Sequence, residues 1–316
     1  MENKTNEKAS SLRWKILRRA LLSHPPTPNP DEQSQTSIKR ISRRTSNGFN
    51  MIPSHIVDDE RSSLSKCNGS AARDARVCYS LPIPGSPQLF LTQRVDNRAD
   101  LSDFEICNRY NIDNTGLVCN WPSEDVLAHY CLSNADIFRS KNVIELGSGY
   151  GLAGFVISAV TEASKVVISD GNPQVVDYTQ HNIEANSGAF GETIVKSMML
   201  HWNQEDIFNV TDTFDIIIAS DCTFFKDFHK GLAQVVKHLL SKAASSEAIF
   251  LSPNRGNSLD LFLEVAQEIG LHFSVTENYD NDVLKRHERF LSGEDRVSWP
   301  SYDKDHCYPL LIRITL

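Results

Sequence analysis

The chain lacks the cysteine spacing that holds small secreted proteins or zinc sites together. Its 316 residues contain seven Cys, an odd number, and no Cys-x-x-Cys pair occurs. This spacing indicates neither a disulfide framework nor a zinc site, so we expect no bound metal. Free thiols persist in reducing compartments, which favours the cytoplasm and the nucleus over the cell exterior.

Long hydrophobic runs are also missing. The longest apolar stretch lies around Gly151–Val160, whereas a helix needs about 20 apolar residues to cross a bilayer. The first ten residues, MENKTNEKAS, are polar and include two Glu, which is unlike a secretory signal. We therefore expect no integral membrane segment and a cytoplasmic location, with the nucleus as a second possibility.

The chain has no overall excess of basic residues. Its net charge is −8 and its pI about 5.7, which argues against a nucleic-acid partner. The charge is uneven, because residues 1–50 hold ten Lys and Arg against four Asp and Glu. The remaining residues are therefore strongly acidic. Hydrophobic residues make up 40% of the chain, enough to bury a sizeable core.

Residues 1–75 are predicted to form a basic, largely disordered N-terminal arm. They contain PPTPNP at 25–30 and many Ser, Asn and Arg, a composition that buries too little apolar surface to fold. One island near residues 11–22 has apolar residues four positions apart beside Arg and Lys, which predicts a short amphipathic helix. Such a helix either docks on an acidic partner or a membrane surface, or packs against its own chain.

Residues 76–140 are predicted to lead into the main domain. Val77–Leu81 and Gln88–Val95 have the composition of paired strands, separated by the turn-rich PIPGSP. A helix is predicted to begin near Ser123, whose hydroxyl can cap it.

Residues 141–316 alternate between strand and helix patterns. This alternation predicts an α/β domain with a mostly parallel sheet that helices cover on both faces. Because no clear helix separates the last two strands, we expect them to form an antiparallel pair at the sheet edge. The seven predicted strands are 142–146, 165–169, 193–199, 214–220, 247–252, 272–277 and 308–315.

A glycine-rich turn follows the first of these strands, in the sequence VIELGSGYGLAG at 143–154. Gly147 and Gly149 allow a sharp backbone turn and the close approach of a ligand. The carboxylate of Glu145, just before the turn, would repel a phosphate but attract a cation. S-adenosylmethionine carries a sulfonium and an ammonium group, so the turn favours this cofactor over a dinucleotide.

Further cofactor contacts are predicted where the next strands end. Asp170 lies 23 residues after Gly147, where a carboxylate binds the ribose hydroxyls in Rossmann-like folds. Asn172 is predicted to assist there, and Trp202 to cover the adenine face. The alternatives are that Trp202 is a core aromatic and that Glu145 and Asp170 are solvated acids.

The sequence SDCTFF at 220–225 follows the fourth strand and faces the same crevice. Asp221 and Phe224 are therefore the candidate catalytic residues, with Ser220 as a further cofactor contact. Asp221 can orient an acceptor ammonium group, and Phe224 can line its channel, although paired Phe more often pack in a core. Trp121 either forms a wall of the cofactor pocket or packs against the helix that follows it.

These motifs resemble the protein-lysine branch of the seven-strand, Rossmann-like class I methyltransferases. In that branch an Asp-x-x-Tyr or Asp-x-x-Phe motif follows the fourth strand, as Asp221-Cys222-Thr223-Phe224 does here. More specific blocks are similar to the calmodulin-lysine N-methyltransferases. These blocks are RWKILRRAL at 13–21, NTGLVCNWPSEDVLAHYC at 114–131, PNRGNSLDLF at 253–262, ENYD at 277–280 and YPLLI at 308–312.

The resemblance implies an S-adenosylmethionine-dependent enzyme that trimethylates one lysine of calmodulin, and we expect it to act as a monomer. Three alternatives remain open at this point. The acceptor can be a lysine of another protein, such as a chaperone or an elongation factor. The fold can be a catalytically inactive calmodulin-binding module, or a dehydrogenase that uses the same glycine turn.

Overall fold

The computed structural model describes residues 48–57, 74–95, 101–113, 115–119, 121–202 and 210–316. All of them belong to the compact unit of residues 41–316, which is distinct from a unit of residues 1–40. The amphipathic helix predicted near 11–22 and most of the predicted basic arm lie outside the described residues.

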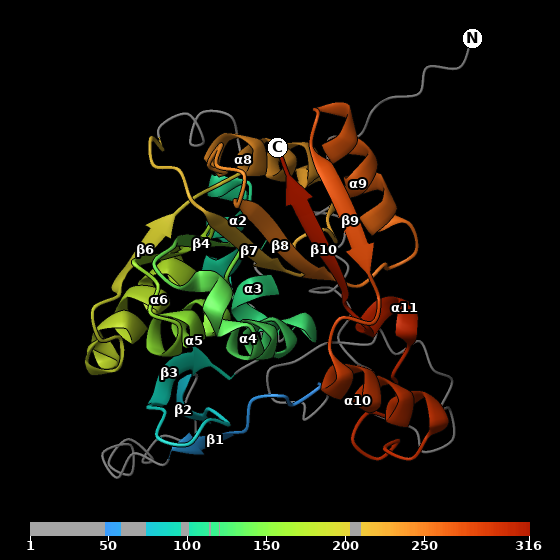
Figure 1. Cartoon of the computed structure of the whole chain (residues 1–316). Coiled ribbons are helices and arrows are strands. Elements are labelled where there is room, and N and C mark those ends of the chain that lie inside the picture. The colour runs from blue at the N-terminus through green and yellow to red at the C-terminus, as the bar shows by residue number, and fades with distance from the viewer. Residues whose placement is uncertain (1–47, 58–73, 96–100, 114, 120, 203–209) are drawn as a thin grey trace. The chain divides into compact units, whose positions relative to one another are not determined.

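A seven-stranded sheet forms the centre of this unit (Figure 1). The strand order is β6-β5-β4-β7-β8-β10-β9, and β10 pairs antiparallel with both β8 and β9 while the other pairs are parallel. The mostly parallel α/β sheet with an antiparallel edge is thereby confirmed. Its strands are β4 (Asn142–Leu146), β5 (Lys165–Asp170), β6 (Ile194–Met199), β7 (Ile216–Ser220), β8 (Glu247–Ser252), β9 (His272–Thr276) and β10 (Leu310–Thr315).

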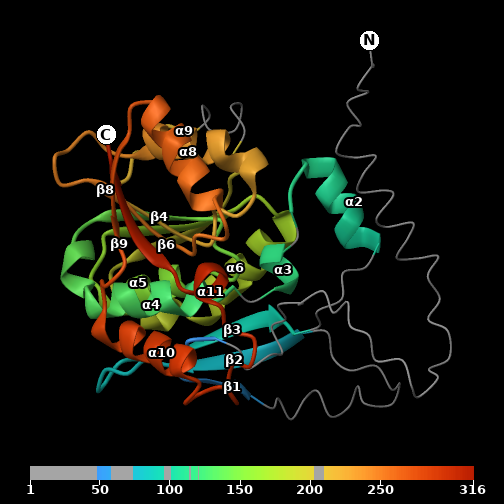
Figure 2. The same cartoon turned by 90° about the vertical axis from the view of Figure 1, so that its right-hand side faces the viewer.

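Helices cover both faces of the sheet, as the nearly continuous apolar runs of β4, β7 and β8 require. One buried cluster joins the sheet to α4 and α5, and a second joins its other face to α8 and α9 (Figure 2). The helices concerned are α4 (Ser123–Ser133), α5 (Leu152–Val160), α6 (Pro173–Ala185), α8 (His229–Leu239) and α9 (Ser258–Glu268).

A second, three-stranded antiparallel sheet lies below α4, α5 and α6 in both views (Figures 1 and 2). It consists of β1 (Ser54–Val57), β2 (Asp74–Ser80) and β3 (Gln88–Arg94). The side chains of Asn182 on α6 and of Asn186, the residue just after α6, pair with the backbone of β3. The expected strand pair is therefore present, with one more strand than expected.

Residues 48–57, which lie within the stretch predicted to be the arm, pack against the folded body. Phe49 is fully buried and makes edge contacts with the rings of Phe290 and Trp299, at centroid distances of 5.7 and 5.9 Å. Residues 48–57 therefore belong to the folded body rather than to the arm. Five of these ten residues are apolar, but so short a stretch carries no reliable periodic signal.

Four described helices were not predicted from the sequence. These are α2 (Leu101–Tyr110), α3 (Thr115–Val118), α10 (Asn281–Ser292) and α11 (Lys304–Cys307). In α10 the buried positions are Val283, His287 and Phe290, so a histidine occupies the middle of the apolar stripe and weakens the pattern. Within the described residues, the structure contains no helix long and apolar enough to span a membrane.

Candidate active site

A pocket opens at the carboxyl ends of β4, β5 and β7, where ligands bind in open α/β sheets. It brings together most of the residues predicted for the site. The predicted residues in its lining are Trp121, Gly147, Gly149, Asp170, Asn172, Trp202, Ser220 and Asp221. Glu145 and Phe224 are not part of this lining.

The glycine turn is fixed by close packing as well as by backbone conformation. Gly147 has φ of 57°, and a Cβ there would lie 2.7 Å from Cys222 Sγ and 3.0 Å from the Trp202 ring. At Gly154, one turn into α5, a Cβ would lie 2.7 Å from Glu145 Oε2. These distances are shorter than van der Waals contact, so a side chain at either position would force its neighbours to shift.

Glu145 supports the turn from behind instead of entering the pocket. Its Oε2 accepts the backbone N–H of Gly154 at 2.9 Å, and only 2% of the residue is exposed. Burial raises the pKa of this carboxyl to about 8, against the lowering effect of the hydrogen bond from Gly154. The predicted role of Glu145 as a direct cofactor contact stays a prediction, and in this structure the side chain holds the turn.

Glu124 is a pocket residue that sequence reasoning did not assign. It lies in the first turn of α4, is nearly buried and contributes to the pocket lining. A carboxylate facing this pocket suits a ligand with an ammonium and a sulfonium group. The signal that could have found it is its place in the WPSE block, next to Trp121.

Asp170 stands at the end of β5 and braces the glycine turn. Its Oδ2 accepts the N–H of Gly149 at 3.1 Å, and its Oδ1 accepts the N–H of Asn172 at 2.8 Å. Burial raises the pKa of Asp170 to about 6. The carboxylate thus lies beside the turn, where a ribose would pass, and a pKa near 6 leaves it mostly ionised at neutral pH.

Trp202 lies across the glycine turn because α8 approaches it closely. A Cβ at Gly231 of α8 would lie 1.9 Å from the Trp202 carbonyl oxygen, so only glycine permits this contact. The indole also meets the ring of Phe228 edge-on, at 6.2 Å. Two aromatic rings therefore border one end of the pocket, an arrangement suited to a flat adenine ring.

Asp221 occupies a strained and buried position directly after β7. Its φ is 56°, which is uncommon for a residue with a side chain and is typical of functional sites. Its Oδ1 forms an ion pair with Arg255 Nη1 at 2.6 Å, and its Oδ2 accepts the N–H of Ser123 at 3.2 Å. Ser123 thus contributes its backbone, whereas the predicted side-chain cap of α4 is absent.

An aromatic wall stands beside Asp221. The rings of Trp121 and Phe224 lie 5.7 Å apart, and the Arg255 guanidinium lies 4.7 Å from the first and 5.2 Å from the second. Phe224 is 39% exposed, so the wall continues from the pocket toward solvent. Arg255 lies in the PNRGN sequence at 253–257, and its role was not predicted from the sequence.

The residues of the pocket fit S-adenosylmethionine. Asn172 Nδ2 is buried and makes no hydrogen bond to any described residue, so it is a donor available to a ligand. Gly116 faces the glycine turn, with its Cβ position 3.7 Å from Gly149 Cα, which leaves the backbone open to a close ligand. Glu124 and Asp170 supply the carboxylates for the cationic end and the ribose.

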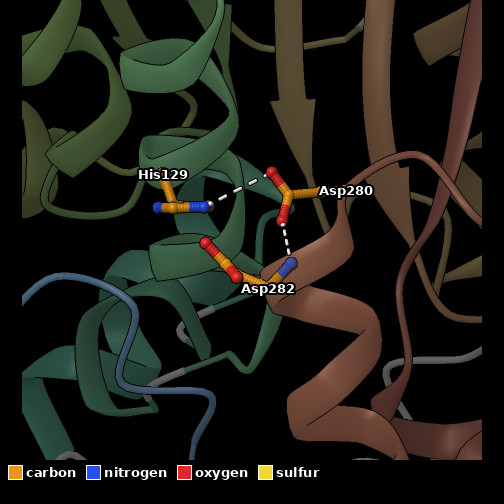
Figure 3. Close-up of side chains that lie close together, drawn as sticks. All are labelled: His129, Asp280 and Asp282. Carbon is orange, nitrogen blue, oxygen red and sulfur yellow. Dashed lines mark hydrogen bonds and ion pairs between the residues drawn. The ribbon is translucent and has the colours of Figure 1, made fainter.

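A cluster of His129, Asp280 and Asp282 lies away from this pocket, between α4 and the start of α10 (Figure 3). His129 Nε2 lies 3.4 Å from Asp280 Oδ2, and Asp280 Oδ1 accepts the N–H groups of Asp282 and Val283. Asp282 pairs with Lys285 at the surface. These contacts explain the cluster as a helix cap joined to an ion pair.

Comparison with known proteins places these features in a family. A family model described as lysine methyltransferase matches residues 106–268. A calmodulin-lysine N-methyltransferase from Arabidopsis thaliana is 61% identical over 98% of both chains. Methyltransferase-like protein 22 from mouse is 26% identical over 57% of this chain and half of its own length.

Among solved structures, a putative S-adenosylmethionine-dependent methyltransferase from Streptococcus mutans is similar at a TM-score of 0.47. Its identity is 14%, over 78% of this chain and 56% of that one. The family model covers half of the chain and the Arabidopsis relative nearly all of it. The chain therefore belongs to the lysine methyltransferase family, whose members use S-adenosylmethionine.

Proposed function

We propose that this enzyme transfers methyl groups to one lysine of calmodulin and carries that lysine to the trimethylated state. The observation that carries the proposal is the 61% identity to a relative named for this activity, which extends over 98% of the chain. The aromatic wall at the pocket mouth supports it, since aromatic faces attract both ammonium and methylated ammonium groups.

The chemical problem for any lysine methyltransferase is the protonated substrate. Lysine has an ordinary pKa of about 10.4, so only about one molecule in a few thousand is neutral at pH 7. The proton must leave to water before the nitrogen can attack. Desolvation and a nearby positive charge both lower the pKa of the incoming amine, and the aromatic rings of Trp121 and Phe224 can contribute to the desolvation.

The transfer itself is an in-line displacement. The cofactor, when bound, supplies an electrophilic methyl group on its sulfonium. The neutral lysine nitrogen would take up that methyl group as the carbon–sulfur bond breaks, which would leave a neutral thioether. The methylated amine carries the positive charge, so charge is conserved, and a further cycle again begins with loss of a proton.

The residues of this chain contribute to methyl transfer mainly by positioning the acceptor lysine. Trp121 and Phe224 can hold the lysine side chain on a line toward the pocket, and alignment of this kind contributes several kcal/mol to lowering the barrier. Asp221 remains our candidate for orienting the nitrogen, although its carboxylate is already held by Arg255 and by the backbone of Ser123.

The substrate is tested by a competition among acceptors. Purified enzyme and radiolabelled S-adenosylmethionine are incubated with unmethylated calmodulin, an elongation factor and a chaperone, separately and together. We expect label on calmodulin in both formats. Label on one of the other proteins, with calmodulin unmodified, would contradict the calmodulin proposal and leave the lysine methyltransferase assignment in place.

A monomeric enzyme, a cytoplasmic location with the nucleus as the second possibility, and the lack of a nucleic-acid partner remain part of this proposal. The acidic net charge supports the lack of a nucleic-acid partner, and the thiol content supports the location.

A further inference from the structure

We propose that Arg255 is a positioning residue for methyl transfer: it holds Asp221 in place through an ion pair and holds the Trp121–Phe224 wall that the acceptor lysine passes. The inference rests on the proposed lysine methylation and deepens it. It concerns a side chain that is not itself part of the pocket lining but contacts two residues that are, Trp121 and Asp221.

The first support is the burial of the ion pair between Arg255 and Asp221. Nη1 and Oδ1 lie 2.6 Å apart, and the two side chains are only 6% and 1% exposed. Removing one partner of such a pair leaves an unpaired buried charge, which is far more costly than losing a surface ion pair. The conformation of Asp221 at the end of β7 therefore depends on Arg255.

The second support is how the chain holds Arg255 in place. Its φ is 46°, and Asp305 of α11 accepts hydrogen bonds from two backbone N–H groups of the turn that contains Arg255. The Oδ2 of Asp305 accepts the N–H of Gly256 at 2.6 Å, and its backbone oxygen accepts the N–H of Arg255 at 2.8 Å. The guanidinium Nε also donates to the His306 carbonyl at 3.2 Å. This turn presents one arginine in one orientation.

The third support is the contact between Arg255 and the aromatic wall. The guanidinium lies over both Trp121 and Phe224, and planar arginine stacks on aromatic faces better than lysine does. Next to it, Ser258 donates its hydroxyl to the carbonyls of Thr223 and Phe224, at 2.6 and 2.9 Å. The segment 253–258 is therefore joined to the segment 221–224 by the Arg255 side chain and the Ser258 hydroxyl.

The arrangement has a consequence for the charge of the acceptor. Without Arg255, the carboxylate of Asp221 would attract the protonated lysine and keep its proton on, because a nearby negative charge raises the pKa of an amine. With Arg255 in place, that attraction is cancelled and the neutral amine is favoured. Other titratable groups lie near the pair, and none of them is substituted in the test variants. They are Glu124 of α4, Cys222, and Asp305 and Cys307 of α11.

The test compares Arg255→Gln, Arg255→Lys and the double variant Arg255→Gln/Asp221→Asn, with calmodulin as acceptor. We measure kcat and KM from pH 6 to 10 and the dissociation constant of S-adenosylhomocysteine by calorimetry. Arg289→Gln is the matched control, because Arg289 is a 55% exposed arginine on α10. Thermal melting identifies any variant that fails to fold, and Arg255→Lys then carries the comparison.

For Arg255→Gln we expect kcat at pH 7.5 to fall on the order of tenfold or more. The pH at which kcat rises on the acidic side of the profile should increase by about one pH unit. The dissociation constant of S-adenosylhomocysteine should change by less than about twofold. In the double variant the acid side should return toward that of the wild type, because no lone carboxylate remains. Arg255→Lys should keep the wild-type pH profile and lose part of kcat.

Two results would overturn the inference. One is wild-type kcat in Arg255→Gln. The other is a lower kcat whose pH profile neither moves nor recovers in the double variant, which indicates packing alone. Failure of the proposed function is a separate result, since it appears in the wild-type enzyme as an unmodified calmodulin; the variants are then compared on the protein lysine that the enzyme does modify.

Discussion

At the scale of single residues, the charge state of Glu145 is the most informative feature of the site. The sequence placed a carboxylate before the glycine turn, and we expected it to attract a cationic cofactor. In the structure the same carboxylate points under α5, where burial raises its pKa to about 8. The side chain acts as a hydrogen-bond acceptor that holds the turn, and Glu124 takes the place in the pocket.

This pKa predicts how stability depends on pH. A carboxyl whose pKa rises from 4.5 to about 8 on folding binds an extra proton in the folded state between these pH values. The free energy of unfolding therefore falls as pH rises through that window. The variant Glu145→Gln has no carboxyl at this position, so its free energy of unfolding lacks this part of the decline with pH. Its amide oxygen can still accept the N–H of Gly154.

We expect Glu145→Gln to match the wild type near pH 4.5 and to exceed it at pH 8 by on the order of 4 kcal/mol, in the absence of cofactor. Urea unfolding at several pH values measures the difference. Taking the difference between the two proteins cancels the similar contributions of Asp125 and Asp170, whose pKa values burial also raises. A variant that is less stable than the wild type at pH 8 would contradict the assignment.

At the scale of elements, the central sheet could be predicted from the sequence and its surroundings could not. Strands such as Ile216–Ser220 carry continuous apolar runs that fit only a buried parallel sheet, and glycines mark the turn beside them. Helix α2, by contrast, has only Asp103 fully buried. Asp103 is held by an ion pair with Arg94 at 2.8 Å, a long-range contact that no local pattern announces.

The site shows the same division. Residues at strand ends, such as Asp170 and Asp221, could be predicted because strand order places them at one edge. The partner of Asp221 could not, since Arg255 reaches it from a turn after β8 that depends on Asp305 in α11. A role that arises from three segments far apart in the chain leaves no spacing to detect.

The cap of α10 gives a prediction at this scale. Asp280 accepts two backbone N–H groups at the helix start and also pairs with His129 of α4. Loss of a helix cap costs about 1 kcal/mol, so Asp280→Ala should lower the free energy of unfolding by about that amount or more. Asp280→Asn keeps a capping oxygen and should lose less. Equal stability of Asp280→Ala and the wild type in urea would show that the cap is unimportant.

At the scale of the whole molecule, the uneven charge suggests a role for the basic residues near the N-terminus. Calmodulin is acidic, and the body of the chain is acidic too, so a basic segment can steer the two proteins together. We expect deletion of residues 1–45 to raise KM for calmodulin and to weaken its dependence on salt. The measurement is steady-state kinetics at low and high ionic strength.

The structure supplies the control for that deletion. Residues 1–45 end before Phe49, which is buried among the rings of Phe290 and Trp299. A deletion through residue 53 removes Phe49 and should lower the melting temperature, whereas deletion through residue 45 should not. If KM stays the same at every ionic strength in the shorter deletion, the basic segment does not steer calmodulin.

The central claim is that this enzyme methylates one calmodulin lysine with S-adenosylmethionine. The most direct measurement is mass spectrometry of unmethylated calmodulin after incubation with the purified enzyme and the cofactor, followed by peptide mapping. Our account predicts three methyl groups on a single lysine, and loss of most of this modification with Asp221→Asn. Calmodulin that stays unmodified while the enzyme binds the cofactor would contradict it.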